Sequence, residues 1–175
     1  KFDTIKEAIE VGLRVGLAYI TVGVVASPLD GFVRLEFKKR KDDGKEYFAL
    51  YFSGPIRSAG TTATCIFIAL CDYVRRKRGY AKYDPSEIEI KRFAMEVRDF
   101  HERVTNLQYY PSEQEIEFMV NHLPVMIDGD PSEKFEVSNY KDLDRMGTNV
   151  LRNGVCLVLA EGLTQKGPKF WKKFS

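Results

Sequence analysis

The stretch FVRLEFKKRKDDGKEYFALYFSGPIRSAGTT, residues 32–62, contains the pattern that decides the fold. Apolar and polar residues alternate from Phe32 to Phe37, and a looser alternation follows from Tyr47 to Phe52. Such a period of two is typical of a β-strand with one buried face. The Asp43-Gly44 pair between the two runs favours a tight turn, because glycine adopts positive φ without strain. The sequence therefore predicts a β-hairpin over residues 32–53.

The second part of this stretch is a loop of small residues that leads into an apolar helix. Unpaired backbone N–H groups and a partial positive charge at a helix N-terminus attract anions. The candidate anion- or DNA-binding side chains of this loop are Arg57, Ser58, Thr61 and Thr62. The loop lacks the lysine of the GxxxxGK[ST] phosphate loop and does not match GxGxxG.

The alternative for this loop is a connection in which Arg57 pairs with a structural carboxylate. Two positive features at one place, the arginine and the helix start, repel one another unless an anion joins them. We expect a carboxylate in the resting domain, with DNA phosphate as the lesser alternative. The candidate carboxylates are Asp30, Glu36 and Glu161.

Helical periodicity and start signals predict five helices around the hairpin. Pro-Ser-Glu at 85–87 and at 111–113 places proline and acidic residues where the first turn of a helix favours them. We expect Ile88, Phe93, Val97 and Phe100 on the inner face of the first of these two helices. The predicted helices cover residues 4–24, 61–78, 85–104, 111–122 and 150–166, the last of them capped by Thr148.

The fold class predicted from these elements is α+β, an antiparallel hairpin or small sheet packed by several α-helices. Short strands are expected at 125–127 and 135–137, within an otherwise irregular stretch. At 175 residues and 44% hydrophobic composition, the chain is long and apolar enough for one domain with a substantial core. Because it does not begin with Met and stops within a helical pattern, we expect a fragment of a longer protein.

Bulk composition excludes several classes of function. The chain has 27 Lys and Arg against 25 Asp and Glu, so its net charge of +2 does not by itself indicate a polyanionic partner. Its three cysteines form no CxxC pair, which favours a reducing, cytoplasmic location over a disulfide framework. The most apolar run, residues 15–26, is shorter than the roughly 20 residues of a membrane span, so no membrane partner is expected.

Two basic segments raise the question of nucleic-acid binding. Residues 75–78 are all basic, but consecutive helical positions point about 100° apart and a helix C-terminus favours cations, so a solvated helix end is the favoured interpretation. The second segment interleaves cations with Phe170 and Trp171, which suits either a phosphate backbone with base stacking or an amphipathic helix packed on a longer chain. Its candidate DNA-binding lysines are Lys166, Lys169, Lys172 and Lys173.

Catalytic and metal-binding patterns are weak. Asp128 and Asp130 flank a glycine, which suits a turn better than a Mg²⁺ site. His101 and His122 have no second ligand at metal-binding spacing, and the hydroxyls of the 54–62 loop have no visible base. We therefore expect no catalytic residues, no metal site and no cofactor in this chain.

Four stretches resemble the N-terminal region of the large subunit of archaeal family D DNA polymerase, in the same order. The stretch ALYFSGPIRSAGTT is similar to the family loop ALYxxGPIRSxGGT, and three further stretches extend the likeness to nearly the whole chain. These are GLAYITVGVVASPLDGF at 16–32, VTNLQYYPSEQEI at 104–116 and TNVLRNGVCLVLAEGLTQK at 148–166.

The resemblance implies a replicative polymerase of two subunits, in which the large subunit polymerises DNA and the small subunit is the 3′–5′ exonuclease. The polymerase carboxylates of that family lie far downstream on double-psi barrels, so Asp128 and Asp130 are not expected to be catalytic. Mg²⁺ is expected for the full-length enzyme. The region itself would be a scaffold for DNA contact, self-association or docking, with DNA and the small subunit as partners. The alternatives are a separate assembly module and a small phosphate-handling enzyme that uses the 54–62 loop.

The chain departs from the family pattern at a few positions. Thr61 replaces the second glycine of GGT, Thr64 and Cys65 replace a Gln-Ala pair, and Asn153 replaces a glycine. The first change weakens the idea that the loop needs a bare backbone at residue 61. Asparagine tolerates left-handed backbone angles, so we expect the last change to be mild.

Overall fold

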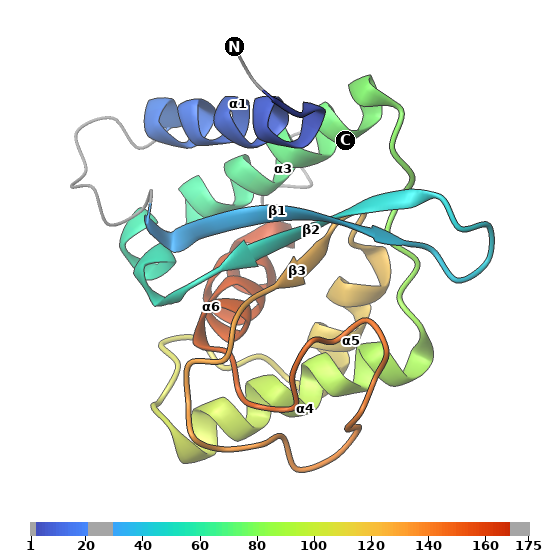
Figure 1. Cartoon of the computed structure of the whole chain (residues 1–175). Helices are drawn as coiled ribbons and strands as arrows, with labels where there is room; N and C mark the ends of the chain where they lie inside the picture. The colour runs from blue at the N-terminus through green and yellow to red at the C-terminus, as the bar shows by residue number, and fades with distance from the viewer. Residues whose placement is uncertain (1–2, 21–29, 169–175) are drawn as a thin grey trace.

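The structure is a computed structural model that describes residues 3–20 and 30–168 (Figure 1). The strands are β1 (Phe32–Lys39), β2 (Glu46–Phe52) and β3 (Met126–Asp128); the helices are α1 (Ile5–Ile20), α3 (Thr61–Arg78), α4 (Glu87–Arg103), α5 (Glu113–His122) and α6 (Asn153–Leu157), with a 3-10 helix η1 (Gly54–Ala59) and a π-helical segment η2 (Val158–Thr164). The sheet has the order β1-β2-β3. Helices α1 and α3 lie on one side of it, and α4, α5 and α6 on the other. The α+β class is confirmed.

The hairpin forms as the sequence predicts. Strands β1 and β2 pair antiparallel, from Phe32 opposite Phe52 to Lys39 opposite Glu46. Gly44 in the turn has φ +71°, the conformation for which glycine is favoured. Strand β3 then pairs with β2 in parallel, with Tyr51 opposite Asp128. The predicted strand at 125–127 is thus present, and its parallel pairing makes a hairpin into a mixed sheet.

Helices α4 and α5 begin where the Pro-Ser-Glu signals place them. Ser86 and Ser112 are the N-caps, and each forms a complete capping box with the glutamate three residues later. The predicted inner face of α4 is correct except at Ile88, which is 51% exposed. Ile88 lies half a helical turn away from Val97, because nine residues at 100° amount to two and a half turns.

Helix α1 buries one apolar stripe, with Ile9, Leu13 and Leu17 in the core. Ile5 and Ala8 precede this stripe; Ile5 is exposed and Ala8 is only partly buried. The last predicted residues of this helix, 21–24, lie outside the described residues.

The final helix begins later than the sequence suggests. Val150 forms an isolated antiparallel bridge with Glu136, and the N–H of Leu151 donates to the carbonyl of Phe135 at 2.9 Å. Residues 150–151 are therefore extended, and α6 starts at Asn153. The Thr148 hydroxyl accepts the N–H of Val150 rather than capping a helix. Tertiary pairing with residues 135–136 thus overrides the apolar helical pattern.

A close approach between the backbones of α6 and β2 fixes where α6 lies. A Cβ on Gly154 would sit 2.3 Å from the carbonyl oxygen of Phe52, so only glycine lets α6 pack against the end of β2. Asn153 does not use the left-handed angles that asparagine tolerates, since positive φ outside glycine occurs at Tyr140 and Asp142 in the described part of the chain. The amide of Asn153 instead lies over Gly54, where a Cβ would meet it at 2.7 Å.

Aromatic side chains of the hairpin pack against α3 and against the segment that follows α3. Phe32 lies 5.0 Å from Phe67 of α3, measured between ring centroids. At the other end of the sheet, Tyr80 stacks on Phe37 at 4.8 Å and contacts Phe48. The core therefore holds α3 and the segment after it firmly against the hairpin. Within the described residues, no helix is long and apolar enough to cross a membrane.

Candidate functional site

The loop between β2 and α3 has the backbone geometry that an anion site needs. Residues 54–59 form η1, and Gly60 then takes φ +82° before α3 begins at Thr61. Helix α3 has no side-chain cap and no acidic residue in its first turn. This start differs from those of α4 and α5, whose first N–H groups are satisfied by serine and glutamate.

Arg57 holds a carboxylate in this loop. Its Nη2 donates to Oε1 of Glu161 at 2.7 Å, and the same oxygen accepts the backbone N–H of Gln108 at 2.8 Å. The Glu161 side chain is 7% exposed, whereas that of Arg57 is 38% exposed. The expectation of a carboxylate partner is confirmed, and Glu161 is the partner. Of the other candidates, Glu36 pairs with Lys6 and Arg34.

A cavity of about 90 Å³ lies beside this ion pair. Thr61 lines it, whereas Ser58 and Thr62, the other hydroxyl candidates, are exposed and do not. Except for Thr64, the lining residues come from three of the four stretches that carry the family resemblance: Ile56, Arg57, Gly60, Thr61, Thr64, Gln108, Leu157, Val158, Glu161 and Gly162. The structure therefore brings together segments that are about 50 to 100 residues apart in the chain.

Of the remaining candidate cations, Lys166 is the one that lies within the described residues. Lys166 is half-buried in the helix that continues from η2. Burial raises the pKa of the Cys65 thiol to about 11, opposed by the positive charge of Lys166, so this cysteine is not an activated nucleophile. Lys169, Lys172 and Lys173 lie outside the described residues.

The two aspartates that invited a metal interpretation are both paired with cations. Asp128 is buried and accepts from Nζ of Lys38 at 2.6 Å and Nη1 of Arg152 at 2.7 Å. Asp130 lies at the surface, where it binds the Arg34 guanidinium through both oxygens, at 2.7 and 2.9 Å. Residues 3–20 and 30–168 contain no cluster of three or more carboxylate, histidine or cysteine ligands.

Sequence analysis missed a buried ion cluster that includes Asp128. Arg152 donates to Glu96 through its backbone N–H and through Nε and Nη2, at 2.9, 3.0 and 2.7 Å. Arg92 lies 3.5 Å from Glu96 and donates to the carbonyl of Thr148. The buried ion cluster consists of Lys38, Arg92, Glu96, Asp128 and Arg152. The one signal in the sequence was Glu96, an acid on the predicted inner side of a helix.

Burial and pairing act in opposite directions on these arginines. Burial would lower the pKa of Arg152, but the attraction of Glu96 and Asp128 outweighs it and raises that pKa. Burial dominates at Arg92 and lowers its pKa despite the nearby Glu96. Two of the Arg92 nitrogens, Nε and Nη1, have no hydrogen-bond partner in the described structure. The cluster thus contains one fully satisfied arginine and one that is only partly satisfied.

The two histidines have local structural roles. Nδ1 of His101 accepts the N–H of Leu107 at 3.0 Å, and its ring stacks on Tyr110 at 4.0 Å. Nδ1 of His122 lies 2.7 Å from the carbonyl oxygen of Phe118. Each ring therefore stabilises the end of a helix, which agrees with the lack of ligand spacing in the sequence.

A small mixed sheet held between helices places the chain in the α+β class of folds. The sequence profile described as "DNA polymerase II large subunit DP2, N-terminal" matches residues 1–175. The chain belongs to this family.

Individual relatives agree with the profile. The chain is 50% identical over 174 residues to the DNA polymerase II large subunit of Nanoarchaeum equitans, and 49% identical over 171 residues to that of Methanosarcina barkeri. The large subunit of Thermoplasma acidophilum is 42% identical over 170 residues. These alignments cover 97–99% of this chain but 14–16% of the relatives, so the chain spans about a seventh of their length.

Proposed function

We propose that this chain is the N-terminal scaffold of the large subunit of an archaeal, replicative, DNA-directed DNA polymerase of family D. The observation that carries the proposal is the match of residues 1–175 to the N-terminal profile of that subunit. In the full-length enzyme, Mg²⁺-dependent polymerisation belongs to large-subunit residues beyond this region. The 3′–5′ exonuclease belongs to the small subunit.

The state of the carboxylates supports a non-catalytic region. Two-metal polymerisation requires carboxylates that are free to bind cations. Asp128 is held between Lys38 and Arg152, and Asp130 is held by Arg34. A phosphate-handling enzyme is less well supported, because the two charged groups that line the loop cavity, Arg57 and Glu161, bind one another.

The outer face of α1 supports a role in assembly. Val11, Val15 and Tyr19 are 41%, 64% and 81% exposed, and their spacing of four residues places them on one side of the helix. The relatives contain about six times as much further chain as this region, and we propose that this further chain covers the face. A second copy or the small subunit on this face would be the alternative outcomes of an interaction test.

Primer extension with Mg²⁺ tests the proposal. We expect the full-length large subunit, assembled with its small subunit, to extend a primer, and the purified 175-residue chain to incorporate no nucleotide. Circular dichroism and a cooperative melt establish that the short chain is folded in the same assay. Incorporation by the short chain that is lost in Asp130→Ala, a surface change, would contradict a non-catalytic role.

A further inference from the structure

One end of the molecule has far more positive charge than the rest. Residues 38–46 and 72–84 together contain ten Lys and Arg but five Asp and Glu, which is a net charge of +5. The whole chain has a net charge of +2, so everything else in it sums to −3. The first segment is the hairpin turn with its flanks, and the second is the end of α3 with the linker to α4.

The fold places these two segments side by side. Nη1 of Arg40 donates to the carbonyl of Lys82 at 2.7 Å, and the N–H of Ala81 donates to the carbonyl of Glu46 at 2.9 Å. The end of α3 joins the same region, because Arg75 donates to the carbonyl of Tyr80 at 2.8 Å. Figure 1 shows the end of α3, the linker and the hairpin turn at the same end of the sheet.

Four of the five acidic residues at this end, all but Glu46, form side-chain contacts within the protein. Asp42 binds Nε and Nη2 of Arg40, at 2.9 and 2.6 Å. Asp84 pairs with Arg145 and accepts the N–H of Lys41 at 3.0 Å. Asp72 pairs with two residues of its own helix. These acids thus fix the backbone of the turn and the linker.

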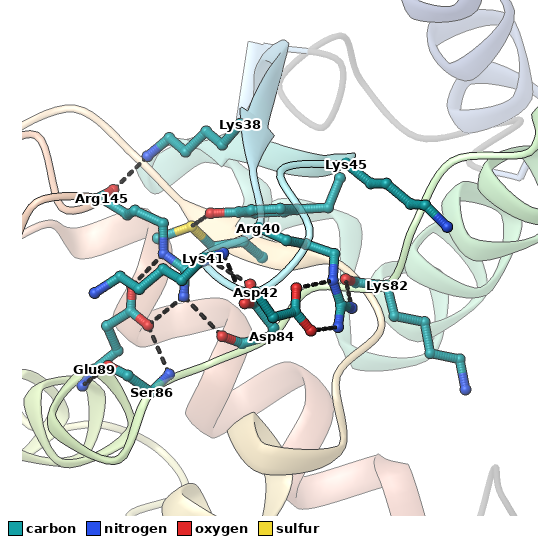
Figure 2. A network of polar contacts seen from close by, with 12 residues as sticks. Lys38, Arg40, Lys41, Asp42, Lys45, Lys82, Asp84, Ser86, Glu89 and Arg145 are labelled. Atoms are coloured by element: carbon teal, nitrogen blue, oxygen red, sulfur yellow. Dashed lines mark hydrogen bonds and ion pairs between the residues drawn. The ribbon is translucent and has the colours of Figure 1, made fainter.

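Apart from Arg76, which pairs with Asp72, the exposed cations at this end have no acidic partner among the described residues. Figure 2 shows Lys41, Lys45 and Lys82 extending away from the network, with no interaction at their ends. Lys77 lies over the ring of Tyr73 at 5.6 Å. We name as the basic end the six exposed cations that form no ion pair with another described residue: Lys39, Lys41, Lys45, Lys77, Arg78 and Lys82.

We infer that the basic end binds the phosphate backbone of double-stranded DNA. The inference rests on the proposed function. DNA is chosen among the possible polyanions because the chain is proposed to be part of a DNA polymerase subunit. Six ammonium and guanidinium groups on a fixed backbone suit phosphates, whose neutralisation releases counterions. They would position the duplex without reading its sequence.

The surroundings favour a duplex over two other partners. Protein interfaces have an apolar and aromatic centre, and single-stranded nucleic acids are held by stacking on exposed aromatic rings. Tyr73 is the one large hydrophobic side chain exposed within the two segments that form the basic end. A surface of lysines with one aromatic ring therefore matches a duplex backbone better than an acidic protein or a single strand.

The test is the salt dependence of duplex binding by the full-length large subunit. The variant Lys41→Gln/Lys45→Gln/Lys82→Gln removes three exposed, unpaired cations. The control Lys91→Gln/Lys134→Gln/Lys141→Gln removes the same charge from lysines elsewhere, two of which are ion-paired, Lys91 with Glu87 and Lys141 with Glu136. We expect the slope of log K against log[salt] to flatten by about 0.9 per lost contact, up to about 2.7 in the variant, and to stay unchanged in the control.

The outcomes separate this inference from the proposed function. An unchanged slope in the variant overturns the inference, even if the wild-type subunit polymerises DNA with its partner. Loss of small-subunit binding with an unchanged slope also overturns it, in favour of an acidic protein surface. Equal flattening in variant and control would show a general charge effect and overturn it as well. Absence of polymerase activity in the wild type would instead contradict the proposed function.

Discussion

In the buried ion cluster, neighbouring opposite charges are 2.6 to 3.5 Å apart, and four of the five side chains are at most 2% exposed. In the basic end, six cations face solvent and none pairs with another described residue. Both regions contain lysine and arginine, and burial makes the difference between them. Removing a charge from water costs several kcal/mol unless an opposite charge and hydrogen bonds replace the water, so interior charges are paired. Charges in solvent need no partner and remain free for a ligand.

The largest effect is expected from breaking the buried ion cluster. Glu96→Ala leaves Arg92 and Arg152 buried without their shared carboxylate. Removing one partner of a buried pair typically costs about 3–5 kcal/mol, which we expect to measure by urea unfolding of the purified chain. Glu102→Ala on the same helix is the control. Its side chain is 52% exposed and pairs with Arg98, so the expected loss is below about 1 kcal/mol. Equal losses in both variants would remove the distinction between the two environments.

An intermediate effect is expected at the Arg57–Glu161 pair, which is buried on one side only. Arg57→Ala leaves Glu161 with the N–H of Gln108, so we expect a loss of about 1 kcal/mol and a lower melting temperature. Lysine lacks the planar fork of arginine, which matters where two parallel hydrogen bonds hold a carboxylate. The structure shows a single Nη2–Oε1 contact, so Arg57→Lys should restore part of the loss.

DNA binding at fixed salt distinguishes the two interpretations of Arg57. A structural arginine lowers the melting temperature when removed and leaves DNA binding unchanged. An unchanged melt with weaker binding would identify the loop as a phosphate site and contradict the carboxylate role.

The smallest effect on stability is expected at the basic end. Exposed, unpaired lysines contribute little to folding, so Lys41→Gln/Lys45→Gln/Lys82→Gln should change the free energy of unfolding by no more than about 0.5 kcal/mol. Urea unfolding beside wild type checks this. A loss comparable to that of Glu96→Ala would mean that these lysines hold the hairpin in place, and the contrast between the two regions would fail.

Features that depend on near neighbours could be predicted from the amino-acid sequence. The Asp43-Gly44 turn and the two Pro-Ser-Glu starts act over a few residues, and the structure contains the hairpin and both capping boxes. The family resemblance was also in the sequence, because its four stretches are collinear and cover nearly the whole chain. For Arg57, the charge of the loop indicated an anionic partner, and Asp30, Glu36 and Glu161 were among the candidate carboxylates.

Contacts between residues far apart in the chain became known from the three-dimensional fold. Glu161 is 104 residues from Arg57, and Glu96 is 56 residues from Arg152. Residues 150–151 became extended because residues 135–136 pair with them, and β3 joined the sheet in parallel. Local periodicity contains no information on such pairings, which are selected by the desolvation of charges and by close packing, as at Gly154. The basic end also depends on the tertiary structure. Residues 38–46 and 72–84 form one positively charged surface because the fold places them side by side.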